Sequence, residues 1–169
     1  LAAQAEVRAE AVGPHGTLTL YESANAGRSS LLPFPGGRGG QSVPVRPLTT
    51  LLTGAPAALK VDVEGAEYEG LGEASRDLLG RFRQIVVELH DLSRLQDPSK
   101  KNLVLEMLSK LNESHVSVHV HANNYDEVCL FDSYWFANAI EVTYVRRDLL
   151  DNTRQVDCIH SECDRPCDP

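Results

Sequence analysis

The sequence predicts an α/β fold in which an open, mostly parallel sheet ends in an antiparallel hairpin. Apolar runs of strand length lie at residues 58–63 and 84–89, separated by a stretch rich in Ala, Glu and Leu. A second helical stretch follows and leads to a third strand at residues 115–122. Because neighbouring parallel strands need a crossover connection, strands and helices that alternate in this way predict a parallel sheet with covering helices.

The segments before this block are shorter and less regular. Residues 4–12 and 17–21 are predicted strands, separated by the turn signal GPHG. Glycine and proline are dense from residue 25 to residue 47, which predicts a long exposed loop of the kind that is usually functional in compact domains. The sequence PLTTLL then predicts a short helical turn ended by Gly54.

The later segments complete the predicted sheet. A polar loop runs through Pro98, and residues 100–111 form an amphipathic pattern whose apolar positions are Leu103, Val104, Met107, Leu108 and Leu111. In residues 115–122 the valines alternate with polar residues, and His115 is expected on the solvated face. EVCLF and residues 139–145 supply two strands with a short polar link, so we expect them to pair with each other antiparallel. Residues 148–169 are an irregular tail.

Composition and charge exclude several classes of protein. The 169 residues are 42% hydrophobic, enough for one domain, 1–169, with its own core. Four arginines stand against three glutamates up to Pro56, whereas the remainder carries a net charge of −9, which argues against a nucleic-acid ligand. No apolar run approaches the roughly 20 residues of a membrane-spanning helix, and the opening segment lacks signal-peptide features. The cytoplasm is the default expectation for the compartment, and no motif indicates an oligomeric state.

The cysteine-rich tail has two interpretations. Cys158, His160, Cys163 and Cys167 offer thiolate and imidazole groups that suit zinc. Their spacing matches no established pattern and the segment is acidic, so free thiols or one disulfide are the simpler interpretation. The sequence therefore predicts no metal site.

Acidic residues gather where the strand at 58–63 ends and a helix begins. Carboxylates at a helix N-terminus are favoured by the helix dipole, which accounts for one or two of Asp62, Glu64 and Glu67. Asp62 is different, because it is expected inside an apolar strand, where a charge needs a partner, and Lys60 is the simplest one. Ligands of open α/β sheets lie beyond the carboxyl ends of the strands, so these acids are candidate site residues.

Two further groups lie at predicted strand ends. Glu88 and His90 are two residues apart and share a face, so they form either a general-base pair or an ordinary surface pair. In HVSVHVHANN, His121, Asn123 and Asn124 lie at the end of the third strand, where the amide pair could hold a hydroxyl or a carboxylate. No G-x-G-x-x-G, G-x-x-x-x-G-K-[ST] or G-x-S-x-G motif is present at the required position.

Four blocks in order, LKVDVEGAEYEGL, IVVELH, VHVHANN and IEVTYVRRD, resemble the FkbM-type methyltransferase family, which uses S-adenosylmethionine. The earlier segments AEAVG and TLTLYESANAGRSSLL are also similar to the family. The resemblance implies a Rossmann-like class I methyltransferase sheet of seven strands whose final strand is antiparallel. It also implies S-adenosylmethionine as cofactor and methyl transfer to a hydroxyl oxygen of a small molecule, such as a sugar or a secondary metabolite.

The resemblance also assigns expected roles to the candidate residues. Asp62 and Glu64 would lie at the end of the fourth strand beside the sulfonium, and Glu88 and His90 at the end of the fifth. Glu64 or His90 would be the base, and Glu10 would lie near adenine. Glu67, His121, Asn123 and Asn124 would contact the acceptor.

The chain departs from the family pattern at two points. The cofactor glycine loop and the ribose-binding acid lie upstream of the region that matches. We therefore expect this chain to be the C-terminal portion of the domain, without the first two strands, and to bind cofactor weakly alone. Ala122 also replaces a glycine that is usual in the family.

Two other functions remain open from the sequence. A non-catalytic α/β module could use the same sheet edge to bind a ligand, which the missing cofactor loop would allow. A metal-dependent hydrolase could use Asp62, Glu64, His90 and His121. The acceptor itself is not identified, because acceptor pockets are built from variable loops.

Overall fold

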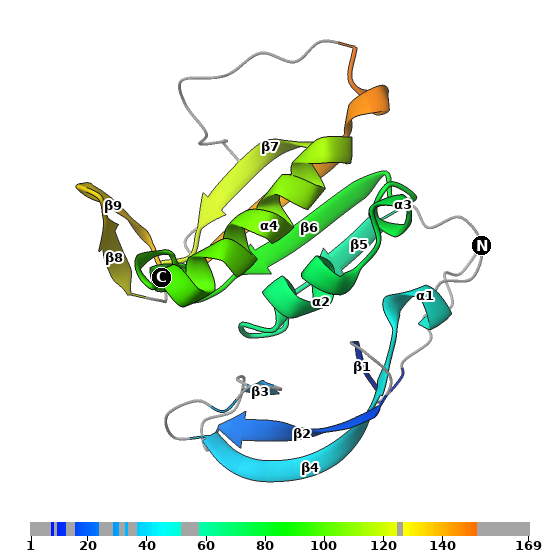
Figure 1. The fold of residues 1–169 in the computed structure, drawn as a ribbon, viewed down its shortest axis with the longest axis vertical. Helices are drawn as coiled ribbons and strands as arrows, with labels where there is room; N and C mark the ends of the chain where they lie inside the picture. The colour runs from blue at the N-terminus through cyan, green and yellow to red at the C-terminus, as the bar shows by residue number, and fades with distance from the viewer. Residues whose placement is uncertain are drawn as a thin grey trace.

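The computed structural model describes residues 8, 10–12, 16–23, 29–30, 33, 37–51, 58–124 and 127–151. Within these residues the fold is a mixed α/β arrangement with two larger sheets and a separate hairpin (Figure 1). No helix in the described part of the chain has the length and apolar character needed to cross a membrane. The predicted cysteine-rich tail with Cys158, His160, Cys163 and Cys167 lies outside the described residues, as does Gly54.

The central sheet has the strand order β5-β6-β10-β7. Its strands are β5 (Ala58–Val61), β6 (Gln84–Leu89), β10 (Ile140–Arg146) and β7 (His115–Ala122). β5 pairs parallel with β6, whereas β10 lies between β6 and β7 and runs antiparallel to both. β5, β6 and β7 therefore point the same way, as the alternating pattern predicted. Two of the three pairings are nevertheless antiparallel, so the mostly parallel sheet is not confirmed.

The expected hairpin between the last two strands is wrong. β8 (Val128–Phe131) pairs instead with β9 (Tyr134–Ala137), a strand that the sequence analysis assigned to a polar link. The turn between them is made by Asp132 and Ser133, whose φ angles of 45° and 80° suit a two-residue hairpin. β10 is thereby freed to pair within the central sheet.

The second sheet has the order β1-β4-β2-β3, with β1 (Ala11–Val12), β2 (Gly16–Ser23), β3 (Ser29–Ser30) and β4 (Gly37–Arg46). The predicted loop at 25–47 is wrong over its second half, because β4 is a ten-residue strand paired antiparallel with β2. Gly40 shows why the glycines of β4, which led to the prediction of a loop, are compatible with a strand. A Cβ there would lie 2.4 Å from the Leu20 carbonyl oxygen, so this glycine permits close strand approach and does not mark a loop.

The helices are α1 (Leu48–Leu51), α2 (Glu67–Glu73), α3 (Arg76–Leu79) and α4 (Pro98–Ser114), with short 3₁₀ turns η1 (Leu92–Gln96) and η2 (Arg147–Leu149). The predicted amphipathic helix is confirmed in α4, which buries Val104, Met107 and Leu111. Asp97 caps its N-terminus by accepting a 2.9 Å hydrogen bond from the Ser99 amide, and Pro98 occupies the first turn.

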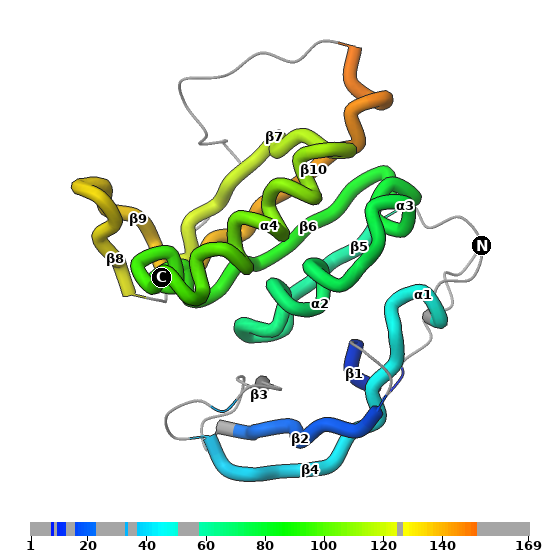
Figure 2. The backbone as a smooth tube through the Cα atoms, in the orientation of Figure 1, coloured from blue at the N-terminus to red at the C-terminus, as the bar shows by residue number. Residues whose placement is uncertain are grey.

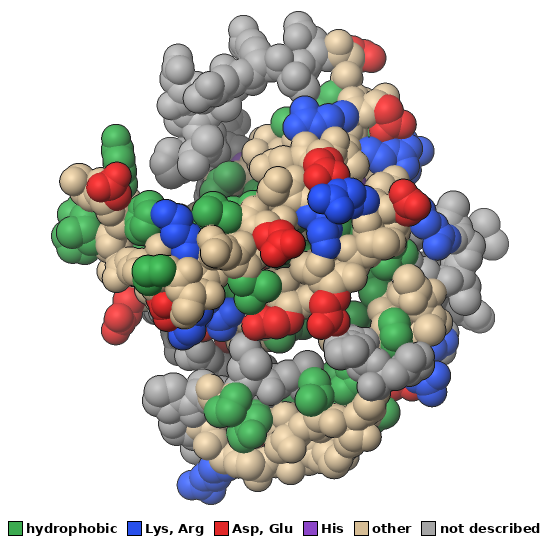
Figure 3. Space-filling view, in the orientation of Figure 1, with side chains coloured by type: hydrophobic (Ala, Val, Ile, Leu, Met, Phe, Trp, Pro, Cys, Tyr) green, Lys and Arg blue, Asp and Glu red, His purple; other side chains and the backbone are tan. Residues whose placement is uncertain are grey.

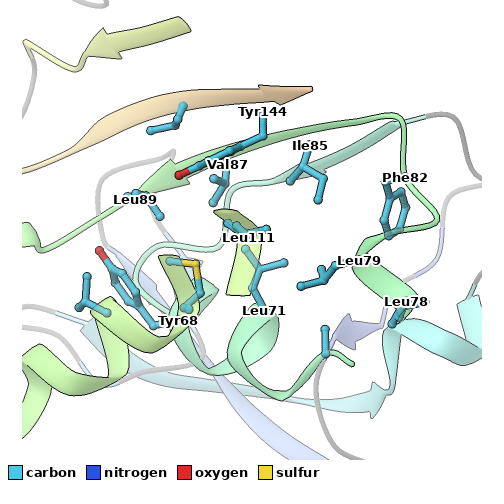
Figure 4. Close-up of a cluster of buried hydrophobic side chains, with 14 of the residues drawn as sticks. Tyr68, Leu71, Leu78, Leu79, Phe82, Ile85, Val87, Leu89, Leu111 and Tyr144 are labelled. Carbon is cyan, nitrogen blue, oxygen red and sulfur yellow. The ribbon is translucent and has the colours of Figure 1, made fainter. Parts of the chain in front are cut away.

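Helices α2, α3 and α4 lie along one face of the central sheet (Figures 1 and 2). The core fills the space between this face and the helices, and Figure 4 shows its members Tyr68, Leu71, Leu78, Leu79, Phe82, Ile85, Val87, Leu89, Leu111 and Tyr144. Burial raises the pKa of the Tyr144 hydroxyl to about 12. On the outer surface of the helical layer, acidic and basic side chains are intermixed (Figure 3).

The opposite face of the sheet is polar. The strand register places Lys60, Glu88, Glu141 and His121 on it. Lys60 pairs with Glu141, so the expected partnership of Lys60 with Asp62 is wrong. The reason is that β5 ends at Val61, which leaves Asp62 beyond the strand, while β10 brings Glu141 within reach of Lys60.

His115 is fully buried, which overturns its expected solvated position. It begins β7 directly at the end of α4, where helix and sheet pack together. Its Nε2 lies 3.1 Å from the Phe82 carbonyl oxygen and its Nδ1 lies 2.8 Å from Ser114 Oγ. Because the carbonyl can only accept, Nε2 carries the proton and the hydroxyl donates to Nδ1. Burial lowers the pKa of His115.

Candidate functional site

The parallel pairing of β5 and β6 brings four predicted residues together at the carboxyl ends of the two strands. Nε2 of His90 lies 3.9 Å from Asp62 Oδ1, 3.8 Å from Glu64 Oε2 and 3.7 Å from Glu88 Oε1. Asp62 follows β5 directly, Glu88 lies within β6 and His90 follows it. These residues are the ones that the strand-end argument selected.

A tight turn between β5 and α2 directs Glu64 back toward the sheet. Glu64 and Gly65 have φ angles of 51° and 100°, both in the left-handed region. This conformation is costly for a non-glycine residue, and it recurs at sites where the surrounding structure holds it. Gly65 is buried in the turn and allows the chain to enter α2 at Glu67, five residues after Asp62.

Glu67 is the most buried acid of this site, with an exposed fraction of zero. Its Oε2 accepts a 2.9 Å hydrogen bond from the Gly65 amide, and its Oε1 accepts a 2.7 Å hydrogen bond from the His90 amide. Oε1 also lies 3.4 Å from Nδ1 of His90. The Glu67 carboxylate therefore links the turn after β5 to the end of β6, and it faces Nδ1 of the His90 imidazole.

His90 is held from its backbone as well as from Glu67. The hydroxyl of Tyr68 donates a 2.6 Å hydrogen bond to the His90 carbonyl oxygen, and Arg94 lies 5.0 Å above the Tyr68 ring. The His90 side chain is 9% exposed, and among the described residues no group hydrogen-bonds its Nδ1. Burial alone would lower the pKa of His90, but the carboxylates of Glu67, Glu64 and Glu88 outweigh burial and raise it.

The residues predicted after the third strand are only partly brought to this group. The side chain of Asn123 donates a 2.8 Å hydrogen bond from Nδ2 to Glu88 Oε1. Its backbone amide donates to the Ala139 carbonyl oxygen at 3.0 Å. His121 lies opposite Glu141 in the β7–β10 ladder, so one strand separates it from β6. Asn124 follows β7.

A cavity of about 490 Å³ lies beside this group, between the central sheet with α2 and the second sheet. Its apolar wall includes Val12, Leu20, Leu59, Val61 and Leu71, and its polar wall includes Glu10, Asp62 and Glu67. Nε of Arg46 donates a 2.9 Å hydrogen bond to Glu10 Oε1. Glu10 Oε2 is buried and has no hydrogen-bond partner among the described residues.

Sequence reasoning missed two features of this site. Tyr68 lies in a helical stretch with no local signal that its hydroxyl supports His90. Glu67 was grouped with the acids at the helix N-terminus and expected to contact the acceptor, with no indication that it is fully buried. Its position two residues after a glycine turn was the only available signal.

Comparison with known proteins identifies the family. The chain matches the family model of the methyltransferase FkbM domain over residues 5–126, well over half of its length. The chain belongs to the FkbM methyltransferase family. The resemblance drawn from the sequence blocks is thereby confirmed, and the matched range contains the whole group around His90. No curated protein and no solved structure matches the chain.

Proposed function

We propose that this FkbM-family chain serves S-adenosylmethionine-dependent methyl transfer to a hydroxyl oxygen of a small molecule, such as a sugar or a secondary metabolite. One observation carries the proposal. Asp62 belongs both to the group around His90 and to the wall of the cavity, so proton-accepting side chains adjoin a space of ligand size. Cavities of about 300 to 1,000 Å³ are typical of small-molecule sites.

The cavity residues fit a nucleoside-bearing cofactor. A buried carboxylate oxygen without a partner, Glu10 Oε2, can accept hydrogen bonds from amino or hydroxyl groups. The apolar part of the lining suits an aromatic base, and Asp62 adds negative charge to the same lining. Glu10 and Asp62 are therefore the residues that would hold the cofactor. When bound, S-adenosylmethionine supplies a methyl group already activated on a sulfonium.

The side chains of the protein would then have to orient the acceptor and to remove the proton of its hydroxyl group. Glu64 or His90 would accept the hydroxyl proton, because both lie at the strand ends beside the cavity wall. Glu67, through its hydrogen bond to the His90 amide, and Tyr68, through the His90 carbonyl, would hold the imidazole in place. Asn123 would keep Glu88 oriented.

The topology supports the same proposal. In the described part of the chain, the antiparallel strand β10 lies between β6 and β7 in a sheet whose other strands share one direction. This order fits a Rossmann-like class I methyltransferase sheet with an antiparallel final strand. His121, Asn123 and Asn124 would then line the acceptor side.

Binding of S-adenosylhomocysteine, measured by isothermal titration calorimetry, tests the cofactor site. We expect Glu10→Gln and Asp62→Asn each to weaken binding about tenfold, the effect of losing one charged hydrogen bond. Glu22→Gln is the matched control, because Glu22 is an exposed glutamate on β2, in the sheet whose strand β1 directly follows Glu10. Absence of binding heat with the unaltered, folded protein, at ligand concentrations high enough to detect weak binding, would contradict the proposal.

The base is tested by turnover. Release of S-adenosylhomocysteine in the presence of a panel of hydroxylated small molecules is measured by mass spectrometry. The variant of the true base, Glu64→Gln or His90→Gln, should lose about 10²- to 10⁴-fold in rate while it still binds the cofactor. A protein that binds cofactor but is unaffected by both variants would refute this assignment.

A further inference from the structure

Three side chains of metal-ligand type converge at the ends of β5 and β6. One oxygen of Asp62, one oxygen of Glu88 and one ring nitrogen of His90 all lie within 4.8 Å of one another. We propose that these three side chains form a binding site for one divalent transition-metal cation. The proposal concerns cation binding and does not require methyl transfer.

The state of the His90 ring is the first support. Its side chain is about nine-tenths buried, and its Nδ1 has no hydrogen-bond partner among the described residues. Nε2 faces Asp62 and Glu88 at 3.9 and 3.7 Å, which is too long for a hydrogen bond. A buried polar ring that lacks hydrogen bonds is costly. A cation bound between Nε2 and the two carboxylates would take the lone pair of Nε2 and leave the ring proton on Nδ1, where it faces Glu67 Oε1.

The contacts behind the three ligands are the second support. A histidine that binds a metal through one ring nitrogen usually directs the other at a carboxylate or a carbonyl. Nδ1 of His90 faces Glu67 Oε1 at 3.4 Å, and Glu67 is itself fixed by two backbone amides. Asn123 orients Glu88 in the same way, with its 2.8 Å hydrogen bond. Two of the three ligands, His90 and Glu88, are therefore held before any cation arrives.

Charge is the third support. Lys60, the nearest lysine along the chain, pairs with Glu141, and no lysine or arginine in the described part of the chain pairs with Asp62 or Glu88. The site thus gathers negative charge without a fixed positive partner. Two carboxylate oxygens and one imidazole nitrogen, without a thiolate, suit ions such as Mn²⁺ or Fe²⁺.

The cation site would also decide between the two proposed bases. With Nε2 engaged by a cation, Glu64 would take the proton of the acceptor hydroxyl as the oxygen–methyl bond forms and the sulfur–methyl bond breaks. This consequence alone rests on the proposed function.

Titration of the metal-free protein with Mn²⁺, followed by electron paramagnetic resonance at about pH 8, tests the site, because a ligating imidazole must be neutral. We expect one bound Mn²⁺ per chain and at least about tenfold weaker binding in both Asp62→Asn and Glu88→Gln. Asp91→Asn is the matched control. It removes the same charge next to His90, but its carboxylate pairs with Arg94 and asparagine tolerates its φ of 52°.

A second readout does not depend on affinity. The bound Mn²⁺ should show nitrogen modulation in spin-echo spectra, and this signal should vanish in His90→Gln while the far-ultraviolet circular dichroism stays unchanged. The site would be overturned if the protein bound no Mn²⁺. It would also be overturned if Asp62→Asn and Glu88→Gln bound Mn²⁺ as tightly as the control Asp91→Asn does. Protein that binds S-adenosylhomocysteine but no Mn²⁺ overturns the cation site alone. Protein that binds Mn²⁺ but no S-adenosylhomocysteine supports the cation site and contradicts the cofactor proposal.

Discussion

One buried carboxylate organises the residues of the candidate site. Glu67 accepts hydrogen bonds from the amides of Gly65 and His90, so it fixes the turn after β5 and the end of β6 together. Its negative charge is also the nearest one to Nδ1 of His90 among the contacts in the described structure. A buried charge is retained only where such contacts stabilise it.

Glu67→Gln should lower the free energy of unfolding by about 1 to 3 kcal/mol, because the amide group presents one acceptor oxygen where the carboxylate presents two, and one backbone amide is left unsatisfied. Chemical denaturation followed by circular dichroism measures the change. Glu69→Gln, on the exposed side of the same helix, should change the stability little. Equal effects of the two substitutions would show that Glu67 has no special structural role.

His115 should make the stability depend on pH. Burial lowers its pKa below the usual value of 6.5, so the folded protein keeps it neutral while the unfolded chain takes up a proton as the pH falls. The His115 contribution to stability is therefore complete above about pH 6.5 and is lost as the pH falls toward the folded-state pKa. Urea unfolding at pH 7.5 and pH 5.5, about one unit on either side of the unfolded-state pKa of about 6.5, should show that His115→Gln loses less stability than the unaltered protein as the pH falls. His119→Gln, on the same strand, should retain the full loss.

At the scale of elements, α4 packs against the sheet through the apolar side chains along one of its faces. Val104, Met107 and Leu111 have no exposed surface and belong to the core. Lys110, on the neighbouring side of the helix, donates to the carbonyl oxygens of Gly72 and Ala74 at the end of α2. α2 therefore begins at the candidate site and ends on α4.

Met107→Ala should destabilise the protein by about 2 to 5 kcal/mol, since it removes a fully buried side chain and leaves a cavity. Leu105→Ala is the control, because Leu105 lies on the same helix but is 46% exposed. Thermal or chemical unfolding separates the two variants. A similar small loss in both would mean that α4 does not pack as described.

β4 offers a matched pair of glycines. Gly40→Ala should destabilise the protein by about 1 to 3 kcal/mol, because the new methyl group would lie 2.4 Å from the Leu20 carbonyl oxygen. A methyl group on neighbouring Gly39 would meet no atom within 4 Å, so Gly39→Ala should be nearly neutral. Unfolding curves that do not distinguish the two would argue against the β2–β4 register.

At the scale of the whole molecule, the cavity joins the two sheets. Residues of β1, β2 and β4 line it from one side, and residues of β5 and α2 line it from the other. A ligand that contacts both sides binds only the folded, assembled form. Binding there must therefore stabilise the protein as a unit.

Under the proposed function, S-adenosylhomocysteine at one hundred times its dissociation constant should raise the free energy of unfolding by about 2.7 kcal/mol. Thermal unfolding with and without the ligand measures this as an upward shift of the midpoint. Asp62→Asn should reduce the shift at the same ligand concentration, and Glu22→Gln should keep it. An unchanged midpoint would indicate that the cavity does not hold this compound.

The sequence by itself determined several of the local elements and the position of the candidate site. Strand and helix periods act over a few neighbouring residues, so β5, β6, β7 and α4 could be predicted. The rule that ligands lie beyond carboxyl ends of strands then selected Asp62, Glu64, Glu88 and His90, which the structure brings together. The FkbM blocks identified the family for the same reason, since each is a short contiguous motif.

Only the tertiary structure decided which strands pair and which acids are buried. β10 pairs with β6 and β7 and not with β8, and β4 is a strand despite its glycines, because strand pairing joins backbone groups far apart in sequence. The same long-range packing assigned Lys60 to Glu141, buried His115 and placed Glu67 behind His90. Charge and hydrogen-bonding capacity belong to each residue, but burial and partners depend on the neighbours that folding supplies.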